Sequence, residues 1–123
     1  MAKKSRKKLF KECEEKLSTL RSEAIKDIAS AKEQLNTTVS GDDGDISIAL
    51  ESRRSATIKY EQSENKLKQI NAALERIASD NYGICEVTGE DIEDKRLLSI
   101  PWTRFSVEGA EINERNNRKF KSA

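Results

Sequence analysis

The stretch Asn36-Thr-Thr-Val-Ser-Gly-Asp-Asp-Gly-Asp-Ile-Ser47 decides the fold, because a long helical pattern runs into it from each side. Its two glycines give the backbone freedom that a chain reversal needs, and its three aspartates favour turns and helix N-caps. The stretch contains no Lys or Arg, so the reversal concentrates negative charge. We therefore predict that the chain doubles back here, with an acidic tip at residues 40–46.

The segment before this stretch has the spacing of a coiled-coil helix. Its apolar residues recur three and four positions apart with one irregular step, and neither Pro nor Gly interrupts residues 2–40. These apolar residues are Phe10, Cys13, Leu17, Leu20, Ala24, Ile28, Ala31 and Leu35. The spacing predicts a helix over residues 4–39.

The segment after the stretch repeats this spacing. Its stripe consists of Ile46, Ala49, Arg53, Ala56, Tyr60, Ser63, Leu67, Ile70, Leu74 and Ile77. Two stripes on either side of a turn can bury each other as an antiparallel hairpin. We predict a second helix over residues 46–79 and a hairpin domain over residues 1–79. Arg53 and Ser63 are polar, so we expect the half of the hairpin near the tip to be the less stable half.

The composition is consistent with long, solvent-exposed helices and argues against several classes of function. Of the 123 residues, 35% are hydrophobic and 37% are charged, which is too lean for a compact globule. The net charge of +1 argues against bulk electrostatic binding to nucleic acid, and we expect no sequence-specific DNA binding. With neither a signal peptide nor an 18-residue apolar span, we expect a cytoplasmic protein without a membrane partner.

The chain offers no set of residues for catalysis. It has no His and only two Cys, so a nucleophile, a base and an orienting group cannot be assembled. We predict that it is not an enzyme and assign no catalytic residue and no bound metal. Composition and heptads alone equally allow a coiled-coil adaptor or a prefoldin-like chaperone, and they also allow a self-associating structural helix. We expect a monomer.

The acidic tip could have several roles, which the sequence distinguishes only in part. A calcium loop is excluded, because the twelfth position counted from each aspartate is Arg53, Arg54 or Ala56 instead of a bidentate Glu. A weak magnesium site shared with a partner's ligands stays open. So does a purely structural role, in which Asp45 caps the second helix and the other aspartates keep the turn soluble.

Both ends of the chain are basic. Lys3, Lys4, Arg6, Lys7 and Lys8 lie together at the N-terminus, and Arg115, Arg118, Lys119 and Lys121 lie near the C-terminus. The N-terminal group is either a handle for an anionic partner or a solvated helix start. The C-terminal group reads as a basic helix end that complements the helix dipole.

Past Ser79 the sequence resembles a known family. The runs Tyr82-Gly-Ile-Cys-Glu-Val-Thr-Gly-Glu-Asp-Ile92 and Arg96-Leu-Leu-Ser-Ile-Pro101 resemble the C4-type zinc-finger module of the DksA/TraR family, which comprises bacterial RNA polymerase-binding transcription regulators. The run Asp42-Asp-Gly-Asp-Ile-Ser47 is similar to the acidic tip of the DksA branch, Asp-x-x-Asp-x-Ala, with Ser47 in the alanine place. The resemblance covers about residues 9–111.

The resemblance also implies a lost metal site. The positions that match the family's zinc ligands are Cys85, Thr88, Ser106 and Gly109, so one thiolate of four remains. Structural zinc needs four donors, almost always thiolate or imidazole. We therefore predict a zinc-free, degenerate module at residues 80–123, which ends in a C-terminal helix. The predicted fold is mainly all-α, a long antiparallel coiled-coil hairpin with this small zinc-finger-like module, and no cofactor is expected.

The function that the resemblance implies is regulatory. The hairpin would enter the secondary channel of RNA polymerase and bring Asp42, Asp45 and Ser47 near the active site, which would alter the stability of promoter open complexes. Family members respond to guanosine tetraphosphate, the stringent-response alarmone, partly through basic side chains. The matching positions Gln69, Ile100 and Ala110 carry no charge, so we expect weakened or absent synergy, with Lys68 and Arg96 as the nearby cations.

Overall fold

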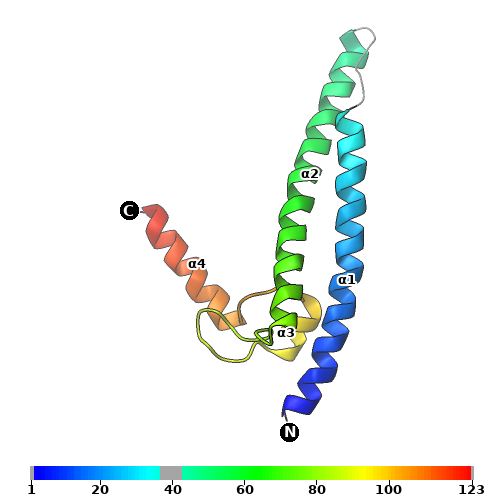
Figure 1. Cartoon of the computed structure of the whole chain (residues 1–123). Coiled ribbons are helices and arrows are strands. Elements are labelled where there is room, and N and C mark those ends of the chain that lie inside the picture. Colours follow the sequence, from blue (N-terminus) through cyan, green and yellow to red (C-terminus); the bar gives the residue numbers. More distant parts are fainter. Residues whose placement is uncertain (1, 37–42, 123) are drawn as a thin grey trace. The chain divides into compact units, whose positions relative to one another are not determined.

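The described part of the chain forms four helices, arranged as in Figure 1. The computed structural model describes residues 2–36 and 43–122, with the side chains of residues 6–36 and 45–119. The helices are α1 (Ala2–Leu35), α2 (Asp43–Ala78), α3 (Asp94–Ser99) and α4 (Val107–Ser122). Within those ranges the only β-type pairing is an isolated antiparallel bridge between Ile84 and Asp91. The predicted all-α fold is confirmed.

The two long helices lie close to their predicted bounds, with one correction at the tip. The first was predicted over residues 4–39 and the second over residues 46–79, whereas α1 ends at Leu35 and α2 begins at Asp43. The last part of the predicted tip is therefore helical. Acidic residues favour a first helical turn because they complement the helix dipole, which is consistent with this earlier start. Residues 37–42, including Asp42, lie outside the described residues.

The chain divides into two compact units. Unit 1 comprises residues 1–18 and 69–123, and unit 2 comprises residues 19–68. The predicted border at residue 79 divides the sequence where α2 ends, whereas unit 1 also takes in the first turns of α1 and the last turns of α2. The physical reason is packing, since these turns contact the segment that follows α2, as described below.

Unit 2 is a two-helix seam built mainly from small side chains. Ala24 and Ala31 of α1 and Ala56 and Ser63 of α2 are buried, and larger seam residues are only half-buried. Arg53, predicted in the stripe, is instead exposed, and the neighbouring Ser52 accepts a hydrogen bond from Gln34 Nε2 at 3.0 Å. A 3.6-residue helix drifts against a strict 3.5-residue repeat, which accounts for this one-residue shift.

Polar contacts in unit 2 lie at the surface. Lys59 Nζ is 4.0 Å from Asp27 Oδ1, and both side chains are more than half exposed. Lys32 Nζ lies 5.9 Å from the centre of the Tyr60 ring. Taken over the ranges 2–36 and 43–122, no helix is long and apolar enough to cross a bilayer.

Candidate functional site

The segment after α2 leaves the helix through a left-handed turn. Asp80 has φ +60°, and Asn81 N–H donates to the carbonyl of Arg76 at 2.8 Å, which is the hydrogen bond of a Schellman-type helix end. Positive φ is uncommon for a residue with a side chain, although aspartate is among those that tolerate it. This turn directs the chain back over the last turns of α2.

Unit 1 has a continuous apolar core shared by the long helices and the module. Cys13 and Leu17 of α1 and Ile70 and Ala73 of α2 are buried. Tyr82, Ile92 and Leu97 supply the module's share, and each is at most 4% exposed. Apolar packing therefore contributes to the compactness of the module. Ile84, Val87 and Val107 are not part of this core, because their side chains are exposed.

Tyr82 links the core to the rest of the module. Its ring lies 5.0 Å from that of Phe10 in an edge-to-face arrangement, and its hydroxyl donates to the Pro101 carbonyl at 2.7 Å. Burial raises the pKa of this tyrosine, so the hydroxyl keeps its proton and its role as a donor. One side chain thus joins α1 to the segment after α3.

Arg6 and Lys16 of α1 hold main-chain carbonyls of the module. Arg6 donates to the carbonyl of Gly83 at 3.2 Å and to that of Ile92 at 3.4 and 3.5 Å, and it pairs with Asp94 at 3.0 Å. Lys16 Nζ donates to the Leu98 carbonyl at 3.3 Å. The sequence grouped Arg6 with the surface lysines around it, so this role was missed.

Arg76 and Arg96 make the same kind of contact near Trp102. Arg76 Nη2 donates to the carbonyls of Trp102 at 3.2 Å and Thr103 at 3.4 Å, and Arg96 Nε donates to that of Phe105 at 2.7 Å. Burial lowers the pKa of Arg76, an effect that nearby Glu86 opposes. Backbone carbonyls in this irregular segment are thereby satisfied by cationic donors in place of a β-ladder.

Gly83 is required by the approach of α1. Its φ is +84°, and a Cβ placed there would lie 2.7 Å from Phe10 Cζ and 2.8 Å from Arg6 Nη2. A larger residue would be strained at this φ and would have to displace the side chains of Phe10 and Arg6. Both residues of the Tyr82-Gly83 pair therefore have a structural role: Tyr82 packs against Phe10, and Gly83 allows α1 to approach closely.

The four positions that match the family's zinc ligands do come together. Cys85 and Thr88 lie in one tight turn, closed by a hydrogen bond from Gly89 N–H to the Cys85 carbonyl at 2.9 Å. Ser106 directly precedes α4, where its hydroxyl accepts the N–H of Gly109 at 3.0 Å as an N-cap does. A Cβ on Gly109 would lie 2.2 Å from the sulfur of Cys85 and 3.2 Å from Ser106 Oγ.

The Cys85 sulfur accepts several hydrogen bonds. Burial raises the pKa of the Cys85 thiol, but hydrogen bonds from the side chains and backbones of Ser106 and Thr88 outweigh it and lower that pKa to about 6. The Cys85 side chain is 1% exposed. The site is thus a hydrogen-bonded sulfur.

These residues do not fit zinc. One thiolate, two hydroxyls and a glycine cannot supply four soft donors, and the sulfur fills the space that a fourth ligand's Cβ needs. Among the residues that the structure describes, no three His, Cys, Asp or Glu side chains are grouped as a metal site requires. We therefore derive no structural or chemical step through zinc.

The acidic tip is described only from α2 onward. Asp45 is the third residue of α2, so it lies in the first turn and is not the N-cap that the structural interpretation assumed. Asp45 and Ser47 are exposed. Ile46, Ile48 and Leu50 follow them and are 37%, 72% and 58% exposed, so Ile46 is not buried as its place in the stripe predicted.

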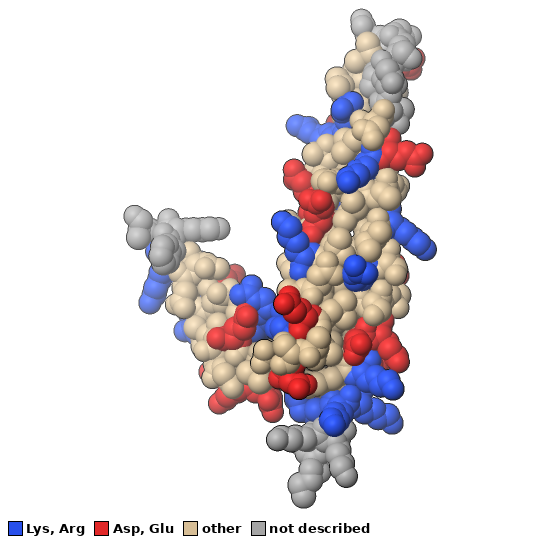
Figure 2. Space-filling view, in the orientation of Figure 1, with Lys and Arg blue, Asp and Glu red and all other residues tan. Residues whose placement is uncertain are grey.

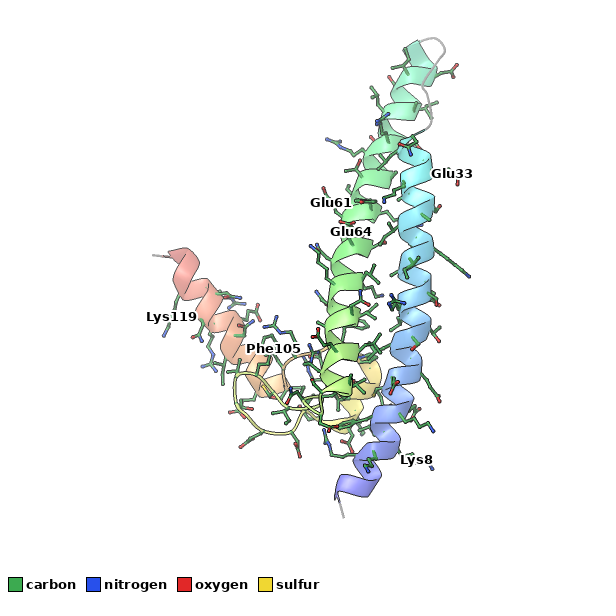
Figure 3. All side chains as sticks on the ribbon, in the orientation of Figure 1. Lys8, Glu33, Glu61, Glu64, Phe105 and Lys119 are labelled. Carbon is green, nitrogen blue, oxygen red and sulfur yellow. The ribbon has the colours of Figure 1, made fainter. Side chains whose placement is uncertain are left out.

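Two of the three alarmone-matched positions share a hollow. Gln69 and Ile100 line a volume of about 200 Å³, whose other lining residues are Trp102, Thr103, Arg104 and Phe105. Arg104 pairs with Glu86, and its guanidinium lies 4.9 Å from the centre of the Phe105 ring, just before α4 (Figure 3). The hollow is therefore aromatic and amide-lined, and its one cation already has an anionic partner.

Residues 80–115 match the family of prokaryotic dksA/traR C4-type zinc fingers. The fold is similar to transcription factor DksA2 from Pseudomonas aeruginosa, with a TM-score of 0.69 and 25% identity, over 89% of this chain and 83% of that one.

Curated relatives match over a shorter length. An uncharacterised protein of Aquifex aeolicus is 46% identical over 54 residues, which is 44% of this chain and 37% of that protein. The RNA polymerase-binding transcription factor DksA of Caulobacter vibrioides is 38% identical over 69 residues, which is 55% of this chain and 49% of that protein. The chain thus spans less than half the length of the curated relatives it matches.

Proposed function

The chain is a DksA-like member of the DksA/TraR family, and from that premise we propose that it is a transcription regulator that binds bacterial RNA polymerase directly. The observation that carries the proposal is the similarity of fold to DksA2, which extends over 89% of this chain and therefore includes the hairpin as well as the module. The Caulobacter relative is a polymerase-binding factor by name. We further propose that the chain acts in the cytoplasm, as a monomer, and without catalysis of its own.

The proposed mechanism is electrostatic and steric. The α1/α2 hairpin enters the secondary channel, and Asp42, Asp45 and Ser47 act near the polymerase active site. Support comes from the exposure of Asp45 and Ser47 in the first turns of α2. The regulator changes promoter open complexes only by binding one polymerase state better than another, so its effect is a shift of population.

We also propose that the module works without zinc. Thr88, Ser106 and Gly109 supply hydrogen bonds and space around the Cys85 sulfur, and cationic donors hold the carbonyls of the module. A regulator of this kind suits conditions in which zinc is scarce. The direct test is elemental analysis of the purified protein together with thermal unfolding in the presence of a chelator. Stoichiometric zinc, or a midpoint lowered by the chelator, would contradict the proposal.

Weak or absent alarmone synergy is the third part of the proposal. Gln69 and Ile100 offer no charge for a phosphate, and Arg96 already donates to the Phe105 carbonyl. Titration of guanosine tetraphosphate into the polymerase complex should leave the open-complex lifetime unchanged. A response that disappears in Lys68→Gln would instead identify Lys68 as a replacement cation.

The function as a whole is tested with core RNA polymerase. Wild type, Asp45→Asn and the control Glu51→Gln are compared in a pull-down and then in an open-complex lifetime assay on a ribosomal-type promoter. Binding by all three, with a shortened lifetime for wild type and the control only, supports the tip as the effector. Failure of all three to bind favours the alternative, a coiled-coil adaptor or prefoldin-like chaperone without a polymerase partner.

A further inference from the structure

The charge of this chain is segregated along its length. Residues 1–11 contain six of the 23 Lys and Arg residues and no Asp or Glu, so the remaining residues have 17 basic against 22 acidic side chains and a net charge of −5. The overall charge of +1 conceals this division. Binding to a polyanion depends on the local cluster, so the net charge does not decide it.

The first turns of α1 use their cations in two different ways. Arg6 faces the module and binds Gly83, Ile92 and Asp94, as described above. Lys7, Lys8 and Lys11 are exposed, and none of the ion pairs found among the described residues includes them. Lysine and arginine side chains gather at this end of α1 (Figure 2), where Figure 3 labels Lys8. We call Lys7, Lys8 and Lys11 the basic foot.

The three lysines lie on one face of the helix. Lys7 and Lys11 are four residues apart, and Lys8 and Lys11 are three apart, which places neighbouring Cβ atoms roughly 5–6 Å from each other. Lys3 and Lys4 precede them in the same helix, and Glu12 follows them. The stripe is therefore a short row of like charges that ends abruptly where the acidic part of α1 begins.

The chemistry of the foot favours a phosphate backbone over a protein surface. Protein interfaces depend on buried aromatic, apolar or arginine anchors. Among the described residues of α1, the first exposed large apolar side chain is Ile25, so the turns that carry the foot present none of their own. Its cations are all lysines, which act as hydrated point charges and lack the planar fork with which arginine binds carboxylates. The interaction that these lysines can make is therefore a salt-sensitive electrostatic attraction to closely spaced negative charges, such as the phosphates of a nucleic-acid backbone.

We propose that the basic foot binds the phosphate backbone of duplex DNA without reading its sequence. This activity goes beyond the proposed polymerase binding and does not require it. It is also compatible with the prediction of no sequence-specific DNA binding, because phosphate contacts carry no base information.

The test is fluorescence anisotropy of a short, mixed-sequence, fluorescein-labelled DNA duplex titrated with the full chain. The variant Lys7→Gln/Lys8→Gln/Lys11→Gln should lose roughly tenfold in affinity at low salt, and the slope of log K against log salt should fall by about 2 to 3, since each phosphate contact contributes about 0.9. The arginine version, Lys7→Arg/Lys8→Arg/Lys11→Arg, should keep wild-type affinity because it keeps the charge.

A matched control removes three cations from the other basic end. Arg115→Gln/Arg118→Gln/Lys119→Gln has the same net charge as the foot variant, and its binding should stay near that of wild type. Circular dichroism must show the same helix content in every variant. Equal losses in both variants would mean that binding follows net charge and would overturn the proposal. The proposal would also be overturned if the wild-type protein did not bind DNA at low salt. It would be overturned as well if the wild-type protein bound polyglutamate through the foot but did not bind DNA.

Discussion

Unit 1 and unit 2 are held together by different means. Unit 1 buries large side chains such as Leu17, Ile70 and Leu97, and its irregular segment is held by cationic side chains that donate to carbonyls. Unit 2 buries mainly alanines and one serine, and the ion pair found among its described residues is solvent-exposed. The difference shows how a small module whose residues do not fit a metal can be stabilised, namely by packing on the first turns of α1 and the last turns of α2. The two helices of unit 2 are stabilised by their contacts with each other.

The largest expected effect is in the core of unit 1. Leu97 is fully buried, so Leu97→Ala should lower the free energy of unfolding by about 2–5 kcal/mol through lost burial and the cavity left behind. An exposed control in unit 2, Ile58→Ala, removes a side chain that is 50% exposed, and should change that free energy by less than about 0.5 kcal/mol. Urea unfolding followed by circular dichroism measures both, and equal losses would contradict the buried place of Leu97 in the core of unit 1.

A second expected effect concerns the carbonyls that Arg76 holds. Arg76→Met leaves the carbonyls of Trp102 and Thr103 without this donor, and should destabilise unit 1 by about 1–3 kcal/mol. Emission of Trp102, the single tryptophan, reports this unfolding directly. Arg54→Met removes an exposed arginine of unit 2 and should stay within about 0.5 kcal/mol. If both variants match wild type, the carbonyl contacts do not stabilise the module.

The two buried thiols of unit 1 sharpen the comparison through pH. Burial raises the pKa of Cys13, whose S–H donates to the Leu97 carbonyl at 3.6 Å, whereas the pKa of Cys85 is lowered to about 6. Thiolate absorbance should therefore titrate near pH 6 in Cys13→Ala, and only above the ordinary thiol range in Cys85→Ala. The reverse assignment would contradict the hydrogen bonds to the Cys85 sulfur.

The same shift makes stability depend on pH. Because the folded pKa of Cys85 lies below the unfolded one, the thiolate stabilises the fold fully above the unfolded pKa near 9, and this contribution is lost as pH falls through about 6. Cys85→Ser should remove that part of the slope between pH 6 and 9. A slope unchanged in Cys85→Ser would assign it to other groups.

The smallest expected effect is at the surface of unit 2. Asp27→Asn breaks the 4.0 Å contact with Lys59, and should cost about 0.2–0.5 kcal/mol at low salt. The loss should vanish when salt is added, because the pair is exposed and screened. A loss of stability that persists at high salt would indicate that Asp27 stabilises unit 2 by something other than this screened ion pair.

Local periodicity was sufficient to predict α1 and α2, because an amphipathic helix repeats its pattern over many turns. It was not sufficient for α3, whose six residues are shorter than two helical turns. Nor did it separate Arg6 from Lys7 and Lys8, since these neighbours differ only in what the rest of the chain brings to them. The contact of Arg6 with Asp94 joins residues 88 positions apart, and no local pattern contains that information.

The candidate site was predicted in part. Matching the family's motif located Cys85, Thr88, Ser106 and Gly109, and the structure brings these four residues together. The lowered pKa of Cys85 was not predicted, because it depends on the directions of two hydroxyls and two backbone N–H groups. At the tip, the motif and the composition were sufficient to identify the aspartates. They did not predict that the second helix already begins at Asp43.

The fit of Gly109 against the Cys85 sulfur limits how a four-thiolate metal site could be introduced here. Gly109→Cys alone places a Cβ 2.2 Å from that sulfur, and Ser106→Cys alone removes the hydroxyl that accepts the first turn of α4. Thr88→Cys alone takes away a hydrogen bond that the thiolate uses. We expect each of these single substitutions to disturb local packing or hydrogen bonding before a metal could bind. A four-thiolate centre at this place would therefore require several simultaneous changes.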